Sequence, residues 1–209
     1  MSRALAWLKR MPIDLGQGAM AERTEGKRIG LRCVPEHQDG LALDLGARAG
    51  TQTRILEEKG YQVISADVTP LFERCLTVDA NDTLPFADGT FDVLWCSEVI
   101  EHLESPESVL GELRRVTRPG GRIVLTTPNS GMWLFRLLDA IGIPPAKLQH
   151  EGHLHFFSAQ GIQSLAPDAR VMGYFPYAGF KATLSSMGLI GWLSPTFVLC
   201  IDVPVGEMG

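Results

Sequence analysis

The sequence predicts an α/β fold: a Rossmann-like, doubly wound, mostly parallel sheet with an antiparallel C-terminal edge and helices on both faces. Three observations lead to this prediction. Short apolar runs alternate with helix-like segments between Leu41 and Asn129. These runs are almost continuously apolar, which is typical of strands covered on both faces. Beyond residue 158, two strand-like segments flank a helix-like one, which favours a hairpin-like sheet edge.

Seven segments have the composition and length of strands. We expect the first five to form the parallel part of the sheet and the last two to form its edge. They are LALDL (41–45), YQVISAD (61–67), CLTVD (75–79), FDVLWC (91–96), RIVLTT (122–127), ARVMGYFP (169–176) and PTFVLCIDVPV (195–205).

The best delimited helix is predicted over residues 106–117. Ser105 is suited to cap it, Pro106 suits its first turn, and Pro119-Gly120-Gly121 is expected to end it. Further helices are expected over Thr51–Lys59, from near Ser158, and over 180–192, with one or two more in residues 1–30 packed outside the sheet.

Composition excludes several classes of protein. The chain has 209 residues, of which 45% are hydrophobic and 21% charged, as in folded globular proteins. The net charge is -5, and residues 1–32 hold seven Lys/Arg against three Asp/Glu, so the rest holds twelve against twenty-one. A body with a charge of -9 argues against nucleic-acid binding.

The expected compartment is the cytoplasm. The four cysteines are far apart and have no zinc-ligand spacing, which favours free thiols. Arg3, Lys9 and Arg10 interrupt the apolar run that a signal peptide needs. The uncharged stretch from Ala182 to Ile201 contains Pro195 and several hydroxyl side chains, so we interpret it as a buried helix, a break and a strand.

A glycine-containing turn follows the first predicted strand. In DLGARAG (44–50), Gly46 and Gly50 allow the backbone to approach a ligand at the carboxyl end of a strand. A dinucleotide fingerprint needs glycine where Arg48 and Thr51 stand, and the Gly-Lys-Ser/Thr of a Walker loop is missing. Pyrophosphate is therefore a poor candidate ligand, and a turn without a ligand remains an alternative.

The next two predicted strands end in groups that suit a nucleoside. Asp67 ends the second strand, where a carboxylate can accept hydrogen bonds from both hydroxyls of a ribose. Asp79-Ala80 ends the third strand, and the following Leu84-Pro85-Phe86 can form a wall for a flat base.

Together these residues resemble the class I S-adenosylmethionine-dependent methyltransferases, in particular the UbiE/UbiG-like group. The resemblance extends over residues 41–129 and includes VDANDTLPFADGTFDVLWCSEVIEHL (78–103) and LRRVTRPGGRIVLTTPN (113–129). It implies S-adenosylmethionine as cofactor and a binding site made by Asp44, Gly46, Gly50, Asp67, Asp79, Ala80 and Cys96. Gly46 and Gly50 would face the methionine part, Asp67 the ribose, Asp79 and Ala80 the adenine, and Cys96 the open side of the sulfonium. Arg48 departs from the family pattern, which has a glycine there.

The resemblance also implies a division of one domain, residues 1–209, into four parts. These are an N-terminal helical segment (1–30), the cofactor-binding core (41–129), an insertion or lid (130–157), and a C-terminal helix and strand pair (158–209).

SEVIEHL (97–103) follows the fourth strand, where an acceptor would meet the methyl group, and it allows three interpretations. Glu98, Glu101 and His102 resemble the metal ligands of some O-methyltransferases. His102 alone is a candidate general base, because histidine side chains exchange protons readily near neutral pH. The glutamates also fit a structural role without metal. If the segment is helical, Glu98 and His102 share one face.

Three further histidines lie in QHEGHLHFFS (149–158), at positions 150, 153 and 155. Related methyltransferases have a similar string on the substrate side. We therefore expect His153 to be the second candidate catalytic residue, after His102. A packed structural histidine is the alternative for each of them.

The predicted function is methyl transfer from S-adenosylmethionine to a small-molecule or lipid-like acceptor, without nucleic acid as partner. Apolar segments 131–145 and 182–201 are expected to cover the acceptor side, with Trp133, Phe135 or Phe156 as its wall. Segment 131–145 and the basic N-terminal helix also fit a weak membrane-facing patch. One alternative is a non-catalytic binding module, favoured by Arg48. Another is a metal-assisted O-methyltransferase that uses Glu98, Glu101 and His102.

Overall fold

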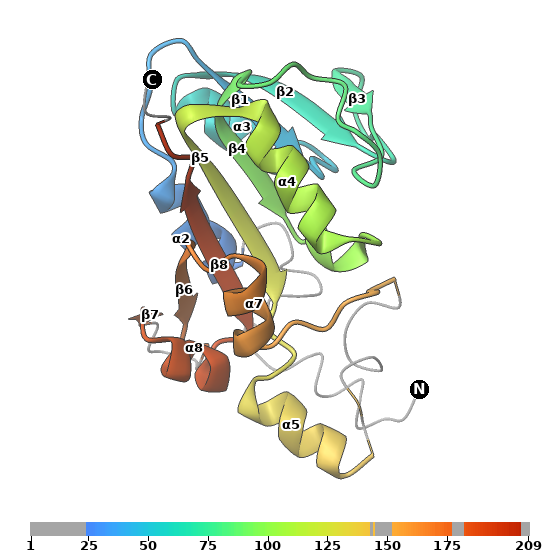
Figure 1. Cartoon of the computed structure of the whole chain (residues 1–209), viewed down its shortest axis with the longest axis vertical. Coiled ribbons are helices and arrows are strands. Elements are labelled where there is room, and N and C mark those ends of the chain that lie inside the picture. The colour runs from blue at the N-terminus through green and yellow to red at the C-terminus, as the bar shows by residue number, and fades with distance from the viewer. Residues whose placement is uncertain (1–23, 143, 145–151, 177–181, 206–209) are drawn as a thin grey trace.

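The computed structural model describes residues 24–142, 144, 152–176 and 182–205 (Figure 1). Its central sheet has the strand order β3-β2-β1-β4-β5-β8-β6-β7. The strands are β1 (Gly40–Leu45), β2 (Tyr61–Asp67), β3 (Cys75–Thr77), β4 (Phe91–Ser97), β5 (Thr117–Pro128), β6 (Arg170–Tyr174), β7 (Thr183–Leu184) and β8 (Thr196–Asp202).

The pairing confirms the predicted fold class. Strands β3, β2, β1, β4 and β5 pair in parallel, whereas β8 is antiparallel to both β5 and β6. The strand order reverses between β1 and β4, since β2 and β3 lie on one side of β1 and β4 and β5 on the other. Such a reversal opens a crevice at the carboxyl ends of the strands, where this class of fold binds ligands.

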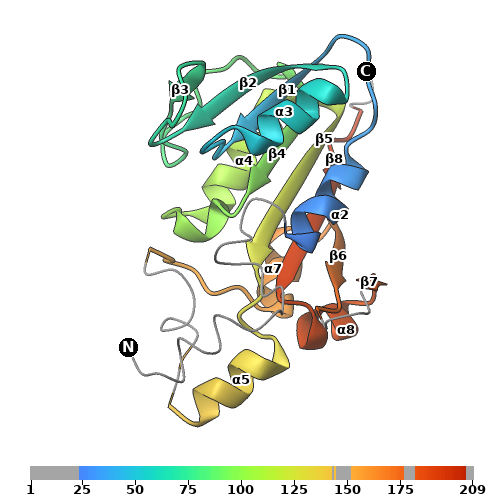
Figure 2. The ribbon, with the colours of Figure 1, turned by 180° about the vertical axis from the view of Figure 1, so that it is seen from behind.

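Helices cover both faces of the sheet. Figure 1 shows α4 (Pro106–Val116) and α7 (Ala159–Leu165) in front of it, and Figure 2 shows α2 (Glu25–Cys33) and α3 (Thr51–Glu58) on the opposite face. The sheet therefore lies between two apolar layers, one containing Leu113 and Ile162 and the other containing Leu56 and Trp95. The remaining helical elements are η1 (Ile100–His102), α5 (Trp133–Ala140) and α8 (Met187–Leu193).

Most predicted helix ends agree with the structure, and their caps explain why. The hydroxyl of Ser105 accepts a hydrogen bond from the backbone N–H of Ser108 at the start of α4, with Pro106 in the first turn. Ser158 caps α7 in the same way. The helix expected within residues 1–30 is α2, which continues to Cys33, and residues 1–23 lie outside the described part of the chain.

Two expectations about local structure are wrong. The Pro119-Gly120-Gly121 turn was expected to separate a helix from a strand, but α4 ends at Val116 and β5 runs through all three residues. Pairing of Thr117 with Phe91 already fixes the strand there, and the register with β4 shifts before Arg122. A proline and glycines can therefore occupy the irregular start of this strand.

The second wrong expectation is a buried helix over residues 180–192. Thr183–Leu184 forms β7, and α8 covers only Met187–Leu193. Leu189 and Trp192 are half exposed, and Ile190 is the buried residue of α8. The helix lies at the end of the sheet, where it contacts β6 and α7 on one side. No helix in the described ranges is long and apolar enough to cross a membrane.

Candidate functional site

The turn between β1 and α3 has a backbone that requires its glycines. Gly46 has φ of +80° and Gly50 has φ of +72°. A Cβ atom at Gly46 would collide with the side chain of Val99, and one at Gly50 would lie 3.0 Å from Phe72 Cε1. Both positions therefore exclude a larger residue, as close packing of a turn against its neighbours requires.

Arg48 has a left-handed backbone conformation. Its φ is +47°, which is uncommon for a residue with a side chain. Its side chain is exposed, and its backbone N–H donates a hydrogen bond of 2.9 Å to Oδ2 of Asp67. This hydrogen bond fastens the turn to the end of β2.

Asp67 is held by backbone groups on both sides of its carboxylate. Besides the bond from Arg48, Oδ1 accepts a hydrogen bond of 2.8 Å from the backbone N–H of Thr69. The residue is 8% exposed. Its carboxylate is therefore fixed in orientation at the carboxyl end of β2, next to the glycine turn.

Asp44 lies beneath the same turn. It is buried, and its Oδ2 accepts a hydrogen bond of 2.6 Å from the hydroxyl of Thr53 on α3, which also contacts the hydroxyl of Ser65 on β2. Burial raises the pKa of the Asp44 carboxyl to about 6. Asp44 thus joins β1, α3 and β2 under the turn.

The loop after β3 presents Asp79 at the surface and Ala80 in the core. Oδ1 of Asp79 accepts hydrogen bonds from the backbone and side-chain nitrogens of Asn81, at 2.9 and 3.0 Å. The side-chain oxygen Oδ1 of Asn81 in turn accepts a hydrogen bond from the backbone N–H of Glu104. A pocket of about 230 Å³ opens between this loop and the first turns of α4, lined in part by Ala80, Asn81 and Ser105.

Cys96 does not face the open edge of the sheet. It is 1% exposed and lies among the core residues of β4. Burial raises the pKa of its thiol. The strand continues for one more residue than expected, to Ser97, and successive strand residues point to opposite faces.

Glu98 follows β4 in an irregular conformation. Its φ is +57°, and only Ile100–His102 is helical, as a single 3₁₀ turn. The condition under which Glu98 and His102 would share a helix face is therefore not met. Oε1 of Glu98 accepts a hydrogen bond of 3.0 Å from the hydroxyl of Thr126, which also contacts the hydroxyl of Ser97 at 2.6 Å.

Glu101 is the most buried acid at this edge, with 1% of its surface exposed. Its Oε2 accepts a hydrogen bond of 3.0 Å from the hydroxyl of Thr127. Its Oε1 is also buried and has no hydrogen-bond partner within the described part of the chain. Burial, and then the charge of Glu98, raise the pKa of Glu101 well above its ordinary value.

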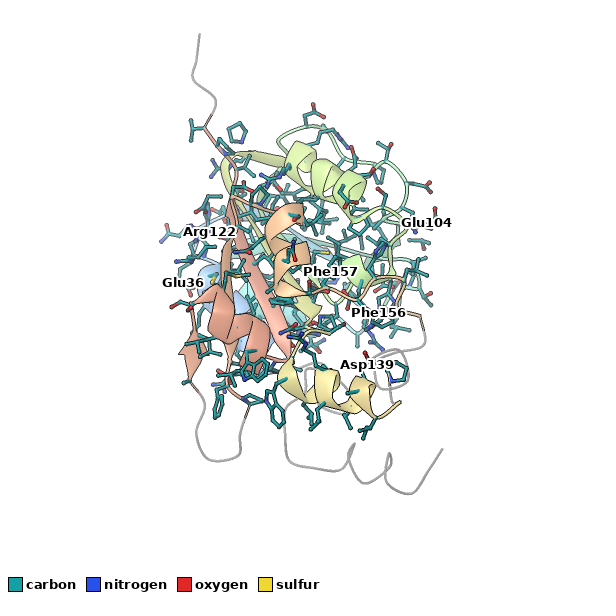
Figure 3. The ribbon with its side chains drawn as sticks, turned by 60° about the horizontal axis from the view of Figure 1, so that its bottom comes forward. Glu36, Glu104, Arg122, Asp139, Phe156 and Phe157 are labelled. Carbon is teal, nitrogen blue, oxygen red and sulfur yellow. The ribbon has the colours of Figure 1, made fainter. Side chains whose placement is uncertain are left out.

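An extended segment, residues 152–157, crosses this edge and closes over Glu101. The backbone N–H groups of Leu154 and His155 both donate to the carbonyl oxygen of Glu101, at 2.9 and 3.0 Å. The Phe157 carbonyl accepts from the backbone N–H of Ser130, after β5. Figure 3 turns this edge of the molecule forward and labels Phe156 and Phe157.

The 152–157 segment brings His153 to Glu101 and His102. Nε2 of His153 lies 3.9 Å from Oε1 of Glu101, and the two imidazole rings meet edge to face with centroids 4.6 Å apart. Nδ1 of His102 lies 2.9 Å from the carbonyl oxygen of Gly152. Glu101, His102 and His153 each offer one ligand atom within 4.8 Å of the others.

The cluster differs from the predicted metal set by one residue. Glu98, predicted beside Glu101 and His102, bonds to Thr126 instead, and His153 takes its place near the other two. His155 stacks on Phe157, away from the cluster. His150 lies outside the described residues.

Comparison with known proteins agrees with this geometry. Residues 43–125 match the family model described as "Methyltransferase domain". This segment is similar to the methyltransferase domain family. It contains the glycine turn, Asp67 and the Glu98–His102 segment.

Curated relatives share part of their length with the chain. A demethylmenaquinone methyltransferase of Beutenbergia cavernae is 35% identical over 100 residues, which cover 44% of this chain and 42% of the relative. A malonyl-[acyl-carrier protein] O-methyltransferase of Pectobacterium atrosepticum is 31% identical over 123 residues, covering 54% and 48%. The chain thus spans about half the length of these relatives.

Solved structures resemble the chain over more of its length. A SAM-dependent methyltransferase from Archaeoglobus fulgidus has a TM-score of 0.60 at 15% identity, covering 88% of this chain and 96% of that one. One from Methanosarcina mazei has a TM-score of 0.59 at 17% identity, covering 85% and 98%. At these identities the likeness establishes the fold.

Sequence reasoning missed three residues near the methyltransferase domain's open edge. Thr126 and Thr127, at the end of β5, donate to Glu98 and Glu101. Lys27, in the first turn of α2, is 7% exposed, and its charge partly offsets the effect of burial on the pKa values of Asp44 and Glu101. The sequence did contain a signal for the threonine pair before Pro128, because two adjacent hydroxyl side chains end a parallel strand there. A single lysine in a helix gives no such signal of a role at the site.

Proposed function

We propose that this chain transfers the methyl group of S-adenosylmethionine to a small-molecule or lipid-like acceptor. The observation that carries this proposal is the glycine turn after β1, joined through Arg48 N–H to Asp67 at the end of β2. This pair lies at the reversal of strand order, where such sheets bind nucleoside ligands. The methyltransferase domain match over residues 43–125 supports the same assignment.

The residues at this edge fit the cofactor. The Asp67 carboxylate accepts two backbone hydrogen bonds and has about four acceptor positions, so two remain for the hydroxyls of a ribose. Asp79 and Ala80 are proposed to contact the adenine, and the backbone at Gly46 and Gly50 the methionine part. Asp44 is proposed to act from beneath, by holding the turn.

The protein's own task is to position the reactants and to move a proton. S-adenosylmethionine, when bound, supplies an electrophilic methyl group, so alignment of the acceptor and exclusion of water account for most of the catalysis. An acceptor hydroxyl must also lose its proton, and we propose His102 as the base. Its contact with the Gly152 carbonyl requires a proton on Nδ1, so the neutral ring has its lone pair on Nε2. His153, beside it, is the second candidate.

The acceptor side is proposed to be apolar, with Leu154 and Phe156 as its wall. Both side chains are exposed on the 152–157 segment that covers Glu101, at 59% and 42%. Of the other residues predicted for this wall, Trp133 is the first residue of α5, beyond β5, and Phe135 is buried. The helix α8, in the second predicted apolar segment, lies at the far edge of the sheet near β6. The substrates in the names of the relatives, demethylmenaquinone and malonyl-[acyl-carrier protein], agree with such an acceptor. Weak contact of the same side chains with a membrane surface is part of this proposal.

A metal-assisted O-methyltransferase is the second candidate function. The buried Oε1 of Glu101, which has no hydrogen-bond partner in the described ranges, supports it, because His102 and His153 lie within ligand reach. A carboxylate and two imidazoles suit a divalent transition metal. Loss of activity with a chelator, and its recovery with manganese or magnesium, would favour this candidate over the base mechanism.

The non-catalytic binding module loses its main support. Arg48 suggested a disrupted cofactor turn, but it keeps the glycine-like backbone and bonds to Asp67.

Binding and turnover measurements test the proposal directly. S-adenosylmethionine and S-adenosylhomocysteine should raise the melting temperature of the protein, whereas NAD should not. Mass spectrometry should then detect methyl transfer to a hydroxylated quinone precursor or a malonyl thioester. Binding of the cofactor without transfer to any small acceptor would favour the binding module, and stabilisation by NAD alone would overturn the proposal.

A further inference from the structure

Asn81 joins the loop after β3 to the start of α4 through its side chain. Its Oδ1 accepts a hydrogen bond of 2.8 Å from the backbone N–H of Glu104, which lies 23 positions later in the chain. Its Nδ2 donates a hydrogen bond of 3.0 Å to Oδ1 of Asp79, two positions earlier. One amide group therefore connects the carboxylate that is proposed to contact adenine with a separate element of the fold.

The Glu104 end of this connection is the more firmly held one. Glu104 lies between η1, which ends at His102, and α4, which Ser105 caps. Leu103, next to Glu104 in the chain, is 6% exposed and belongs to the same core cluster as the apolar side chains of α4. The backbone N–H of Glu104, which is labelled in Figure 3, is thus a donor whose position the core fixes.

The Asp79 end depends on Asn81, because Asp79 is exposed and packing does not hold its side chain. Oδ1 of Asp79 accepts a second hydrogen bond, of 2.9 Å, from the backbone N–H of Asn81. Two donors use both lone pairs of this oxygen. Oδ2 is then the oxygen that can accept a hydrogen bond from an amine, and Asn81 sets the direction in which it points.

An amide at position 81 meets the demands of both neighbours. Asp79 needs a donor and the N–H of Glu104 needs an acceptor, and an asparagine side chain holds one of each in a single plane. An aspartate would keep the acceptor but would place a second carboxylate beside Asp79, and an alanine would offer neither group. Asn81 also lines the pocket of about 230 Å³ between this loop and α4, so an open space lies beside these hydrogen bonds.

We propose that Asn81 is a positioning residue for cofactor recognition: it holds Asp79 so that Oδ2 accepts a hydrogen bond from the amine of adenine and disfavours a purine with a carbonyl group there. The inference rests on the proposed binding of S-adenosylmethionine. A carbonyl oxygen has no proton to share with a carboxylate oxygen, and the two repel each other. A carboxylate that is free to turn away avoids this repulsion, so discrimination between the two purines depends on how firmly Asp79 is held.

Calorimetry with S-adenosylhomocysteine and S-inosylhomocysteine tests the inference, because a carbonyl group replaces the purine amine in the second ligand. The unsubstituted chain should prefer S-adenosylhomocysteine by about tenfold or more. Asn81→Ala should weaken S-adenosylhomocysteine binding roughly five- to tenfold, but should change the affinity for S-inosylhomocysteine less than about twofold. A merely structural effect on the loop would weaken both ligands equally.

Asn81→Asp separates the two bonds of the amide. It keeps an acceptor for Glu104 but loses the donor to Asp79, so we expect the same loss of preference as in Asn81→Ala. Hydrogen exchange at the Glu104 backbone amide should distinguish the variants, since it should be roughly tenfold faster in Asn81→Ala and nearly unchanged in Asn81→Asp. Glu107→Gln, exposed in the first turn of α4, is the control for both measurements.

The failure of this inference is distinguishable from the failure of the proposed function. With S-adenosylhomocysteine bound by the unsubstituted chain, equal affinities for the two ligands would overturn the inference alone. A preference that either variant leaves unchanged, or unchanged exchange at Glu104 in Asn81→Ala, would do the same. If the unsubstituted chain does not bind S-adenosylhomocysteine, the proposed function is overturned, and this inference with it.

Discussion

The two sides of the proposed active site differ in how far along the chain their residues come from. On the cofactor side, Gly46, Arg48 and Asp67 lie in one β1–α3–β2 unit, and 19 positions separate the two residues that bond. On the acceptor side, 50 positions separate His102 from Gly152, which it contacts. The first side is built by one supersecondary unit, and the second depends on a segment that returns from β5 and is fastened at Glu101 and Ser130.

The difference shows that residues close together in the chain fix the geometry of a local motif. The geometry of a long-range cluster depends instead on how distant segments pack. The turn after β1 is fixed by positive φ angles and by the hydrogen bond from Arg48 to Asp67 in the same unit. The cluster of Glu101 and His153 needs the path of residues 152–157, which no short-range pattern specifies. The following variants are expected to affect one side and leave the other unchanged.

His102→Ala should have the largest effect, and only on the acceptor side. Loss of a general base lowers turnover by about 10²–10⁴-fold. The affinity for S-adenosylhomocysteine, measured by calorimetry, should stay within about twofold, since His102 contacts Gly152 and His153 and not the glycine turn. His37→Ala is the control, because the His37 ring packs at a tilt against Tyr61, with ring centroids 5.3 Å apart. Equal losses of turnover and of cofactor affinity would show that the cofactor side and the acceptor side do not act independently.

The sequence was sufficient to predict the fold because the strands of the parallel sheet and the helices that cover them have their own signals. Five near-continuous apolar runs and the Ser105-Pro106 start of α4 all appear where the structure has them. The sequence was not sufficient to predict the burial of α8. Its apolar residues favoured a buried helix, but a helix at the end of the sheet has too few neighbours to bury Leu189 and Trp192.

For the candidate site, the sequence indicated Asp67, Glu101, His102 and His153, but not how they are arranged. The E-x-x-E-H spacing favoured a helix, whereas β4 extends to Ser97 and Glu98 takes a left-handed conformation. The same extension leaves Cys96 inside the core. A shift of one residue in a strand end reverses which side chains face the edge, and the sequence does not fix strand ends to one residue.

Gly46→Ala should remove the cofactor side and destabilise the fold. A side chain costs about 1–2 kcal/mol in the left-handed conformation, and the collision with Val99 brings the loss of unfolding free energy to about 3 kcal/mol. Urea unfolding measures it. Gly111→Ala in α4, where a Cβ has no neighbour within 4 Å, is the matched control and should add about 0.5–1 kcal/mol of stability. If both variants behave alike, the turn is not constrained as described.

Asp44→Asn should change how stability depends on pH. The folded protein holds the Asp44 proton more tightly than the unfolded chain, because burial raises the pKa from the ordinary 3.8 to about 6. The resulting stability is complete below pH 4 and is lost as pH rises through about 6, a difference of about 2–3 kcal/mol. The variant, measured by urea unfolding from pH 4 to pH 7, should lack this decline. Asp82→Asn, at an exposed position, should keep it.

Asp67→Ala should weaken the cofactor side without touching the acceptor cluster. Loss of hydrogen bonds from a ribose to a carboxylate costs about 1.5–3 kcal/mol, or roughly ten- to a hundredfold in affinity for S-adenosylhomocysteine by calorimetry. Glu58→Ala, exposed at the end of α3, serves as control. Unchanged affinity in a folded Asp67→Ala protein would remove Asp67 from the cofactor site.

Phe156→Ala should have the smallest effect, and it tests whether the acceptor side is an apolar wall. The side chain is 42% exposed, so an acceptor that covers about 40 Å² of it gains about 1 kcal/mol. The KM for the acceptor should then rise roughly fivefold while the cofactor Kd stays constant. Leu76→Ala is the control, because Leu76 is similarly exposed, at 47%, but lies on β3 at the opposite edge of the sheet. A higher KM in both variants would point to a general loss of stability. An unchanged KM in Phe156→Ala would mean that the acceptor does not pack against the 152–157 segment, and that the segment serves chiefly to bring His153 to Glu101.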